Sequence, residues 1–350
     1  TDAYPDPGTG GTGIYELAGG HHYIGVTDFS FNRESPGGPP AGGNVDNLRV
    51  DIPRGLMPNP RAFDRCTEAE LQAHNCPVSS QIGTEELTLY IGALHALTGD
   101  ITLQIPLYNM TPLSNPEGGE QEDVVARFAF DPAEAGEALA GIPALSGLVA
   151  ALLDLHPVHI VGGVRDEPSG FGPFDYGLYF TIEHLPAYDG GPTSPGVLRT
   201  NLTFWGAPGD PAHDAERGVS CVGLPTMGLS PCTPLPPPGS APDPALPFLS
   251  NPTECTGQAL QGRLTVYSQP QGDGTVLSDT RTDQTPEIVD RDDGTVKSGA
   301  QECQQLTLAP ALDLGPQLGP PDSPAGPEVT IAMANEGLAD RDRFAESHAR

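Results

Sequence analysis

Glycine and proline interrupt this chain so often that its regular segments are expected to be short. The 350 residues include 44 glycines and 40 prolines, nearly a quarter of the total. A mixture of this kind lies between a folded β protein and a low-complexity chain. Between the interruptions, apolar and polar residues alternate with the period of a half-buried strand. We therefore predict a folded, mainly β protein made of β-sandwich modules, with short helical insertions and long Gly/Pro-rich loops.

The alternating pattern recurs along most of the chain. The predicted strands are 25–32, 47–52, 86–91, 99–107, 124–130, 158–164, 175–183, 197–205, 262–268, 275–278, 287–290, 305–308 and 329–336. The sequence D-G-T-V occurs at 273–276 and again at 293–296, and both copies predict hairpin turns.

Two regions predict short helices. Residues 66–75 place Glu70 three residues after Thr67, which is the spacing of a capping box. The apolar stretch 133–155 contains three acidic residues and Pro143, which excludes a membrane-spanning helix. We expect that stretch to form two short helices packed on a sheet.

Composition along the chain suggests five parts. They are an extended N-terminal segment at 1–20, a larger β-sandwich module with helical insertions at 21–233, a Pro-rich connector at 234–247, a smaller β module at 248–326, and a C-terminal strand and tail at 327–350. The connector has the composition of a polyproline-type linker.

Acidic residues outnumber basic ones by 46 to 16, so the formal net charge is -30. A chain without a basic patch has no means of displacing counterions from nucleic acid, and anionic membranes repel it. We therefore expect no nucleic-acid partner and no membrane span. The acidity favours solubility; divalent-cation binding and a saline habitat are the alternatives that the composition leaves open.

The six cysteines fall into near-neighbour pairs, none with the spacing of a metal site. We expect the disulfides Cys66–Cys76, Cys221–Cys232 and Cys255–Cys303. Disulfides form in oxidising compartments, so this pairing predicts an extracellular or cell-surface protein.

No set of residues predicts catalysis. The nucleophile elbow of serine hydrolases is absent. His213 and Asp214 lie in a loop with Asp210 and Arg217, and we expect these side chains to hold the loop against the sheet. Glycoside hydrolysis needs two positioned carboxylates, which a chain with so many acids does not reveal by sequence.

Metal sites are equally weakly indicated. His21 and His22 are adjacent, so on a strand they point to opposite faces and do not chelate one ion together. Asp290, Asp292 and Asp293 partly resemble the start of a calcium-binding loop, but the spacing differs and the distant bidentate Glu is missing. We favour a hairpin turn there, and expect no cofactor; calcium is the one ionic candidate.

Several longer motifs occur in a fixed order. They are NLRVDIPRGLMPNP at 47–60, CTEA at 66–69, CPVSSQIG at 76–83, PLYN at 106–109, DYGL at 175–178, LTFWGAPGDPAHDAERG at 202–218, PFLSNPTECTG at 247–257 and CQQL at 303–306. In this set the chain resembles secreted, multi-module β-rich surface proteins of high-GC Gram-positive bacteria. The resemblance implies tandem β modules on the cell exterior and no catalytic site. Two departures stand out: the aromatic residue expected before Pro310 is missing, and the pattern stops after one copy.

The last predicted strand has no evident successor to pair with. Its sequence V-T-I-A-M-A-N-E echoes the first strand, which begins Val26-Thr27. Alternating Val329, Ile331 and Met333 suit insertion into a groove left open in a neighbouring molecule. We therefore predict a secreted structural subunit, not an enzyme, that assembles head-to-tail into a fibre or surface-layer homopolymer. A monomeric adhesin or ligand-binding module is the alternative, and a secreted hydrolase is the third.

Overall fold

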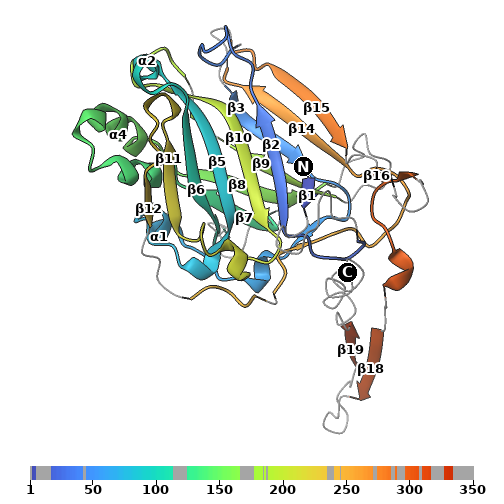
Figure 1. Cartoon of the computed structure of the whole chain (residues 1–350). Helices are drawn as coiled ribbons and strands as arrows, with labels where there is room; N and C mark the ends of the chain where they lie inside the picture. The colour runs from blue at the N-terminus through green and yellow to red at the C-terminus, as the bar shows by residue number, and fades with distance from the viewer. Residues whose placement is uncertain are drawn as a thin grey trace.

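The computed structural model describes most of the chain. The described residues are 2–4, 17–41, 45–112, 124–165, 177–183, 185–186, 188–234, 240–244, 246–270, 274–284, 288–289, 296–306, 310–316 and 327–333. One large, curled antiparallel sheet dominates the molecule, and the helices are few and short (Figure 1). The predicted mainly β fold is therefore confirmed.

The main sheet contains thirteen strands. Its hydrogen-bonded order is β1 (Asp2–Tyr4), β2 (Ile24–Ser30), β10 (Pro195–Trp205), β5 (Gln81–Ile91), β6 (Ile101–Asn109), β7 (Ala126–Phe130), β8 (Val158–Val164), β9 (Leu178–Ile182), β3 (Val45–Asp51), β14 (Gln261–Ser268) and β15 (Ser278–Gln284). On a side branch, β11 (Val219–Gly223) pairs with β6 and with β12 (Cys232–Pro234).

Three short ribbons complete the strands. They are β4 (Met57–Pro58) with β13 (Leu249–Ser250), β16 (Ile288–Val289) with β17 (Val296–Lys297), and β18 (Pro310–Pro316) with β19 (Pro327–Met333). Figure 1 shows β18 and β19 as a hairpin that extends away from the main sheet.

The core lies inside the curl of the sheet, where alternate residues of each strand point inward. On β5 these residues are Leu87, Leu89 and Ile91, all fully buried. The Phe128 ring meets the Phe204 ring at 5.3 Å, and further aromatic rings from β9 and from the segment before β13 surround it. Aromatic packing of this kind contributes beyond the buried area alone.

The helices lie in the connections between strands. They are α1 (Glu68–Gln72), α2 (His95–Thr98), α3 (Ala133–Gly136) and α4 (Ser146–Leu153), with single 3-10 turns at η2 (Pro60–Ala62), η3 (Val78–Ser80), η4 (Gly92–Leu94), η5 (Glu137–Leu139), η6 (Pro143–Leu145), η7 (Pro211–His213), η8 (Pro225–Met227) and η9 (Cys303–Gln305).

Two helix predictions are confirmed. Thr67 and Glu70 form the expected reciprocal capping box at the start of α1. The stretch 133–155 forms α3 and α4, which pack together, and Pro143 starts the turn between them. Of the helices that the structure describes, none is long and apolar enough to cross a membrane.

All three predicted disulfides are present. Cys66–Cys76 closes the excursion that contains α1, and Cys221–Cys232 joins two residues directly opposite each other on β11 and β12. Cys255–Cys303 links the segment after β13 to η9.

Some strand predictions are wrong. The strand expected at 275–278 lies instead at β15, whose sequence SDTRTDQ has no apolar alternation and forms a strand by pairing with β14. Residues 303–305 form η9, although a strand was expected from residue 305; residues 307–309 lie outside the described part. The pattern also fails to reveal β11, β12 and β18.

Strands from both predicted modules share the main sheet. β14 follows the predicted connector at 234–247, yet its residues 263–268 pair with β3. The division into a larger and a smaller module stays a prediction.

Candidate functional site

Two strands that do not pair with each other, β2 and β3, border one apolar cavity. β2 and β3 lie near opposite ends of the hydrogen-bonded order, yet their inward side chains line one apolar cavity of about 40 Å³. The lining residues are Gly25, Thr27, Phe29, Val50, Ile52, Leu56, Pro58, Ile160, Phe180, Ile182, Leu202, Phe204, Phe248 and Leu249. We call this region between β2 and β3 the seam.

The outer edge of β2 is only partly paired. β1 covers residues 24–26 of β2, and within the described chain no strand pairs with residues 28–30 on that side. A partly paired edge beside an apolar cavity has the two features that strand addition uses, main-chain hydrogen bonding and pockets for alternate side chains.

The predicted assembly strand is not alone. β19 contains Val329, Ile331 and Met333, as expected, but it pairs with β18. This corrects the expectation of a strand without a partner in the same chain. The register sets Leu312 opposite Ile331 and Leu314 opposite Val329. The sequence did not reveal β18, because its two prolines and Gly315 obscure a strand pattern.

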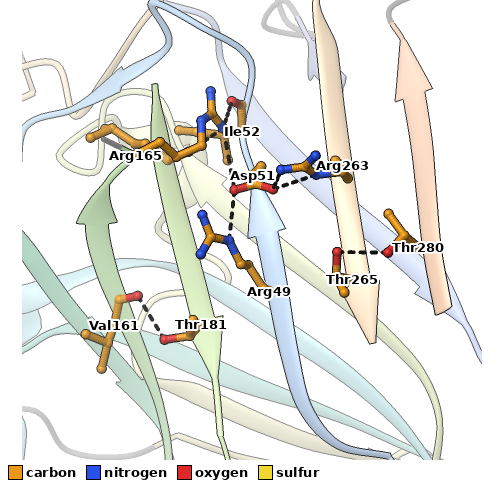
Figure 2. Close-up of polar contacts among 10 residues, drawn as sticks. Arg49, Asp51, Ile52, Val161, Arg165, Thr181, Arg263, Thr265 and Thr280 are labelled. Atoms are coloured by element: carbon orange, nitrogen blue, oxygen red, sulfur yellow. Dashed lines mark hydrogen bonds and ion pairs between the residues drawn. The ribbon is translucent and has the colours of Figure 1, made fainter. Parts of the chain in front are cut away.

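A buried charge cluster lies on the opposite, outer face of β3 (Figure 2). The Asp51 carboxylate is fully buried: Arg49 Nε donates to Oδ1 at 3.0 Å, and Arg263 Nε donates to Oδ2 at 2.8 Å. Arg165 Nη1 lies 3.8 Å from Oδ1 and donates to the carbonyl oxygens of Ile52 and Leu178. Three guanidinium groups therefore converge on one carboxylate that joins β3 to β14.

The sequence motif at 47–60 contains two members of this cluster, Arg49 and Asp51, without revealing it. Arg49 and Asp51 are two residues apart, so they share a strand face, whereas Arg165 and Arg263 come from distant parts of the chain. Replacing half of such a buried network is costly, because it leaves unpaired charges in the interior.

A second buried acid lies inside the core. Glu85 of β5 is opposite Leu202 of β10 and Ile105 of β6, and it is 1% exposed. The Thr200 hydroxyl donates to Glu85 Oε1 at 2.5 Å, while Oε2 has no hydrogen-bond partner among the described residues. Burial raises the pKa of the Glu85 carboxyl to about 8, so this side chain is mainly neutral at pH 7.

His74, which follows α1, contacts one carboxylate on each side of α3 and so links these two parts of the chain; we call these contacts the His74 clamp. His74 Nε2 lies 3.2 Å from Asp131 Oδ2, and Nδ1 lies 2.9 Å from Glu137 Oε1. Both ring nitrogens face carboxylates, so both carry protons when both contacts are hydrogen bonds. The hydrogen bond to Asp131 is the main cause that raises the pKa of His74 to about 9. Glu134, fully buried nearby, has its pKa raised to about 8 by burial.

The predicted anchoring contacts of the loop after β10 are found only in part: the hydrogen bonds of the Asp210 and Asp214 carboxylates lie within the loop, and ring stacking places His213 against the sheet. The His213 ring stacks between Trp205 and Tyr23, with ring centroids 4.5 Å from each. Arg217 donates to the Asp214 carboxylate and to two carbonyl oxygens of the loop. Within the motif at 202–218, this stack gives Trp205 and His213 a packing role.

The remaining predicted ionic sites gain no support. Asp290, Asp292 and Asp293 lie outside the described residues, between β16 and β17. The His21 ring contacts the Leu249 carbonyl oxygen, and His22 is buried, with its pKa lowered to about 4 by that burial. Among the described residues, no group of three or more His, Cys, Asp or Glu is arranged to hold a metal ion.

Comparison with protein-family models, with curated proteins and with solved structures gives no match for this chain. The geometry therefore defines a class only: a mainly β protein with three disulfides, a large curled sheet, an apolar cavity between β2 and β3, and the buried carboxyl groups of Asp51 and Glu85.

Proposed function

We propose that this protein is a secreted structural subunit that assembles head-to-tail, with β19 of one copy adding to β2 of the next. The single observation that supports this most is the seam, where a partly paired strand edge borders an apolar cavity. The three disulfides favour an oxidising, extracellular compartment. The resemblance to secreted surface proteins belongs to the same proposal.

The terminal hairpin is suited to exchange. A two-stranded ribbon alone is marginally stable in water, and β18 and β19 pair with each other apart from the main sheet (Figure 1). Moving β19 onto a neighbour's β2 replaces one set of main-chain hydrogen bonds by another and brings apolar residues to the seam. A head-to-tail contact of this kind generates a filament when its rotation does not close.

Truncation tests the proposal. Deleting residues 327–350 is expected to abolish filaments, seen by electron microscopy, while circular dichroism shows that the truncated chain stays folded. A synthetic peptide of residues 327–333 should then bind the truncated chain, and the same peptide with Ile331→Asp should not. Filaments from the truncated chain would refute strand donation. A single monomer peak from the full chain at every concentration would favour the monomeric adhesin.

A further inference from the structure

Two neighbouring rows of residues on the outer side of the main sheet differ in charge from the chain as a whole. Cross-strand register aligns Thr181, Arg49, Thr265 and Thr280 in one row across β9, β3, β14 and β15. The neighbouring row contains Tyr179, Asp51, Arg263 and Thr282. Figure 2 shows Arg49 and Arg263 reaching Asp51, and Thr265 beside Thr280 on the neighbouring strands. We call these two rows the arginine face.

The arginine face presents no exposed carboxylate among these eight residues. Asp51, its one acid, is fully buried beneath the guanidinium groups, whereas the side chains of Arg49 and Arg263 are 35% and 25% exposed. The whole chain has 46 acidic residues and a net charge of -30. Most other approaches between two copies therefore bring like charges together.

Two contacts orient the Arg49 guanidinium and leave one edge of it available to bind an anion. Its Nε donates to Asp51, and its guanidinium stacks 4.1 Å from the centre of the Tyr179 ring. The two terminal nitrogens, Nη1 and Nη2, meet no acceptor among the described residues. A guanidinium fixed at one edge and stacked on a ring loses little entropy when it binds a carboxylate, and its planar fork matches that group.

We infer that the arginine face is an interaction surface that receives the acidic surface of a second copy of this chain. Charge complementarity identifies the occupant, because carboxylates dominate the rest of the molecule. The hydroxyls of Thr265 and Thr280, which hydrogen-bond each other across the strands at 3.2 Å, offer further polar contacts. A sugar ring is less suited, because Arg49 already covers the exposed side of Tyr179. This contact rests on the self-association in the proposed function, but not on strand donation.

Charge variants measured by sedimentation velocity test the inference. In the full chain and in the chain lacking residues 327–350, a salt-sensitive association is expected that weakens as added salt shortens the Debye length below about 10 Å. Arg49→Glu should weaken it about tenfold at low salt, and Arg49→Gln should weaken it less. Arg281→Gln is the matched control, because Arg281 is 78% exposed on the adjacent strand in a row outside the arginine face.

Each outcome separates this contact from strand donation. Loss of filaments on truncation, with an Arg49-dependent association retained, supports both ideas. Unchanged association of Arg49→Glu, or an equal loss in Arg281→Gln, overturns the arginine face and leaves strand donation standing. A truncated chain that stays monomeric at all salt concentrations also overturns it. Binding of polygalacturonate through Arg49 without self-association would identify an acidic glycan as the occupant and refute the second copy.

Discussion

Replacing Glu85 by glutamine should change how the stability of this protein depends on pH, because the buried Glu85 carboxyl titrates at a different pH in the folded and unfolded chains. In the folded chain Glu85 lies in the apolar core with a pKa of about 8, and in the unfolded chain its pKa returns to about 4.5. The shift corresponds to about 5 kcal/mol at full deprotonation, an upper value because relaxation and water entry reduce it.

The sign follows from which state holds the proton. Below pH 4.5 both states are protonated, and Glu85 adds no pH-dependent term. As the pH rises, the unfolded chain releases the proton first, so unfolding becomes more favourable up to about pH 8. The contribution of Glu85 to the stability of the wild type should therefore fall from pH 5 to pH 9, with Glu134 contributing in the same direction. Buried His22, whose pKa is lowered to about 4, contributes in the opposite direction up to about pH 6.5, so the comparison with the Glu85→Gln variant isolates the Glu85 contribution.

Glutamine keeps the size of Glu85 and its acceptor for Thr200 but does not titrate. At pH 4 the variant should match the wild type to within about 1 kcal/mol. At pH 9 it should be more stable by roughly 3 kcal/mol. Urea unfolding at fixed pH values, with disulfides intact, measures both. Glu86→Gln is the control, because its half-exposed carboxylate pairs with Arg199. A stability difference that is the same at pH 4 and pH 9 would refute the reasoning.

Three further changes test other contacts. Asp51→Asn should destabilise the fold by about 3–5 kcal/mol, since it leaves the buried Arg165 and the partly buried Arg49 and Arg263 without their carboxylate. Asp279→Asn, an exposed acid on β15, should cost under about 1 kcal/mol in the same denaturation assay. His74→Gln should lower the melting temperature at pH 6, where the imidazolium is charged, and lose that effect as the pH rises through about 9; a deficit that is equal at pH 6 and pH 10 contradicts the clamp. Replacing Cys255 and Cys303 by serine opens a loop of 48 residues and should cost about 4 kcal/mol by chain entropy, and an unchanged urea midpoint would show that this link constrains little.

Local sequence signals predicted the features that depend on neighbours in the chain. Alternation located β2, β6, β8 and β10 to within a few residues, because a half-buried strand repeats every two residues. The capping box at Thr67 is equally local, since its two hydrogen bonds span three residues. The disulfide pairs followed from pairing neighbouring cysteines; Cys66–Cys76 and Cys221–Cys232 span 10 and 11 residues, and Cys255–Cys303 spans 48.

Buried polar residues made the alternation pattern harder to recognise, and the predicted bounds of a strand were then wrong. β5 begins at Gln81, five residues before the predicted start at residue 86. The prediction started late because Glu85 and Glu86 interrupt the alternation of apolar and polar residues. Burying Glu85 depends on Thr200 and on the core around it, which come from other strands. No local pattern distinguishes this acid from the many that face water.

The sequence by itself determined a mainly β, acidic, disulfide-linked chain, because alternation, composition and short loops are properties of adjacent residues. Only the tertiary structure decided which strands pair. β14 joins β3 across more than two hundred residues, β15 is a strand because β14 pairs with it, and β19 pairs with β18. The seam, the Asp51 cluster and the arginine face all arise from these long-range pairings, since backbone hydrogen bonds between strands carry no local sequence signature.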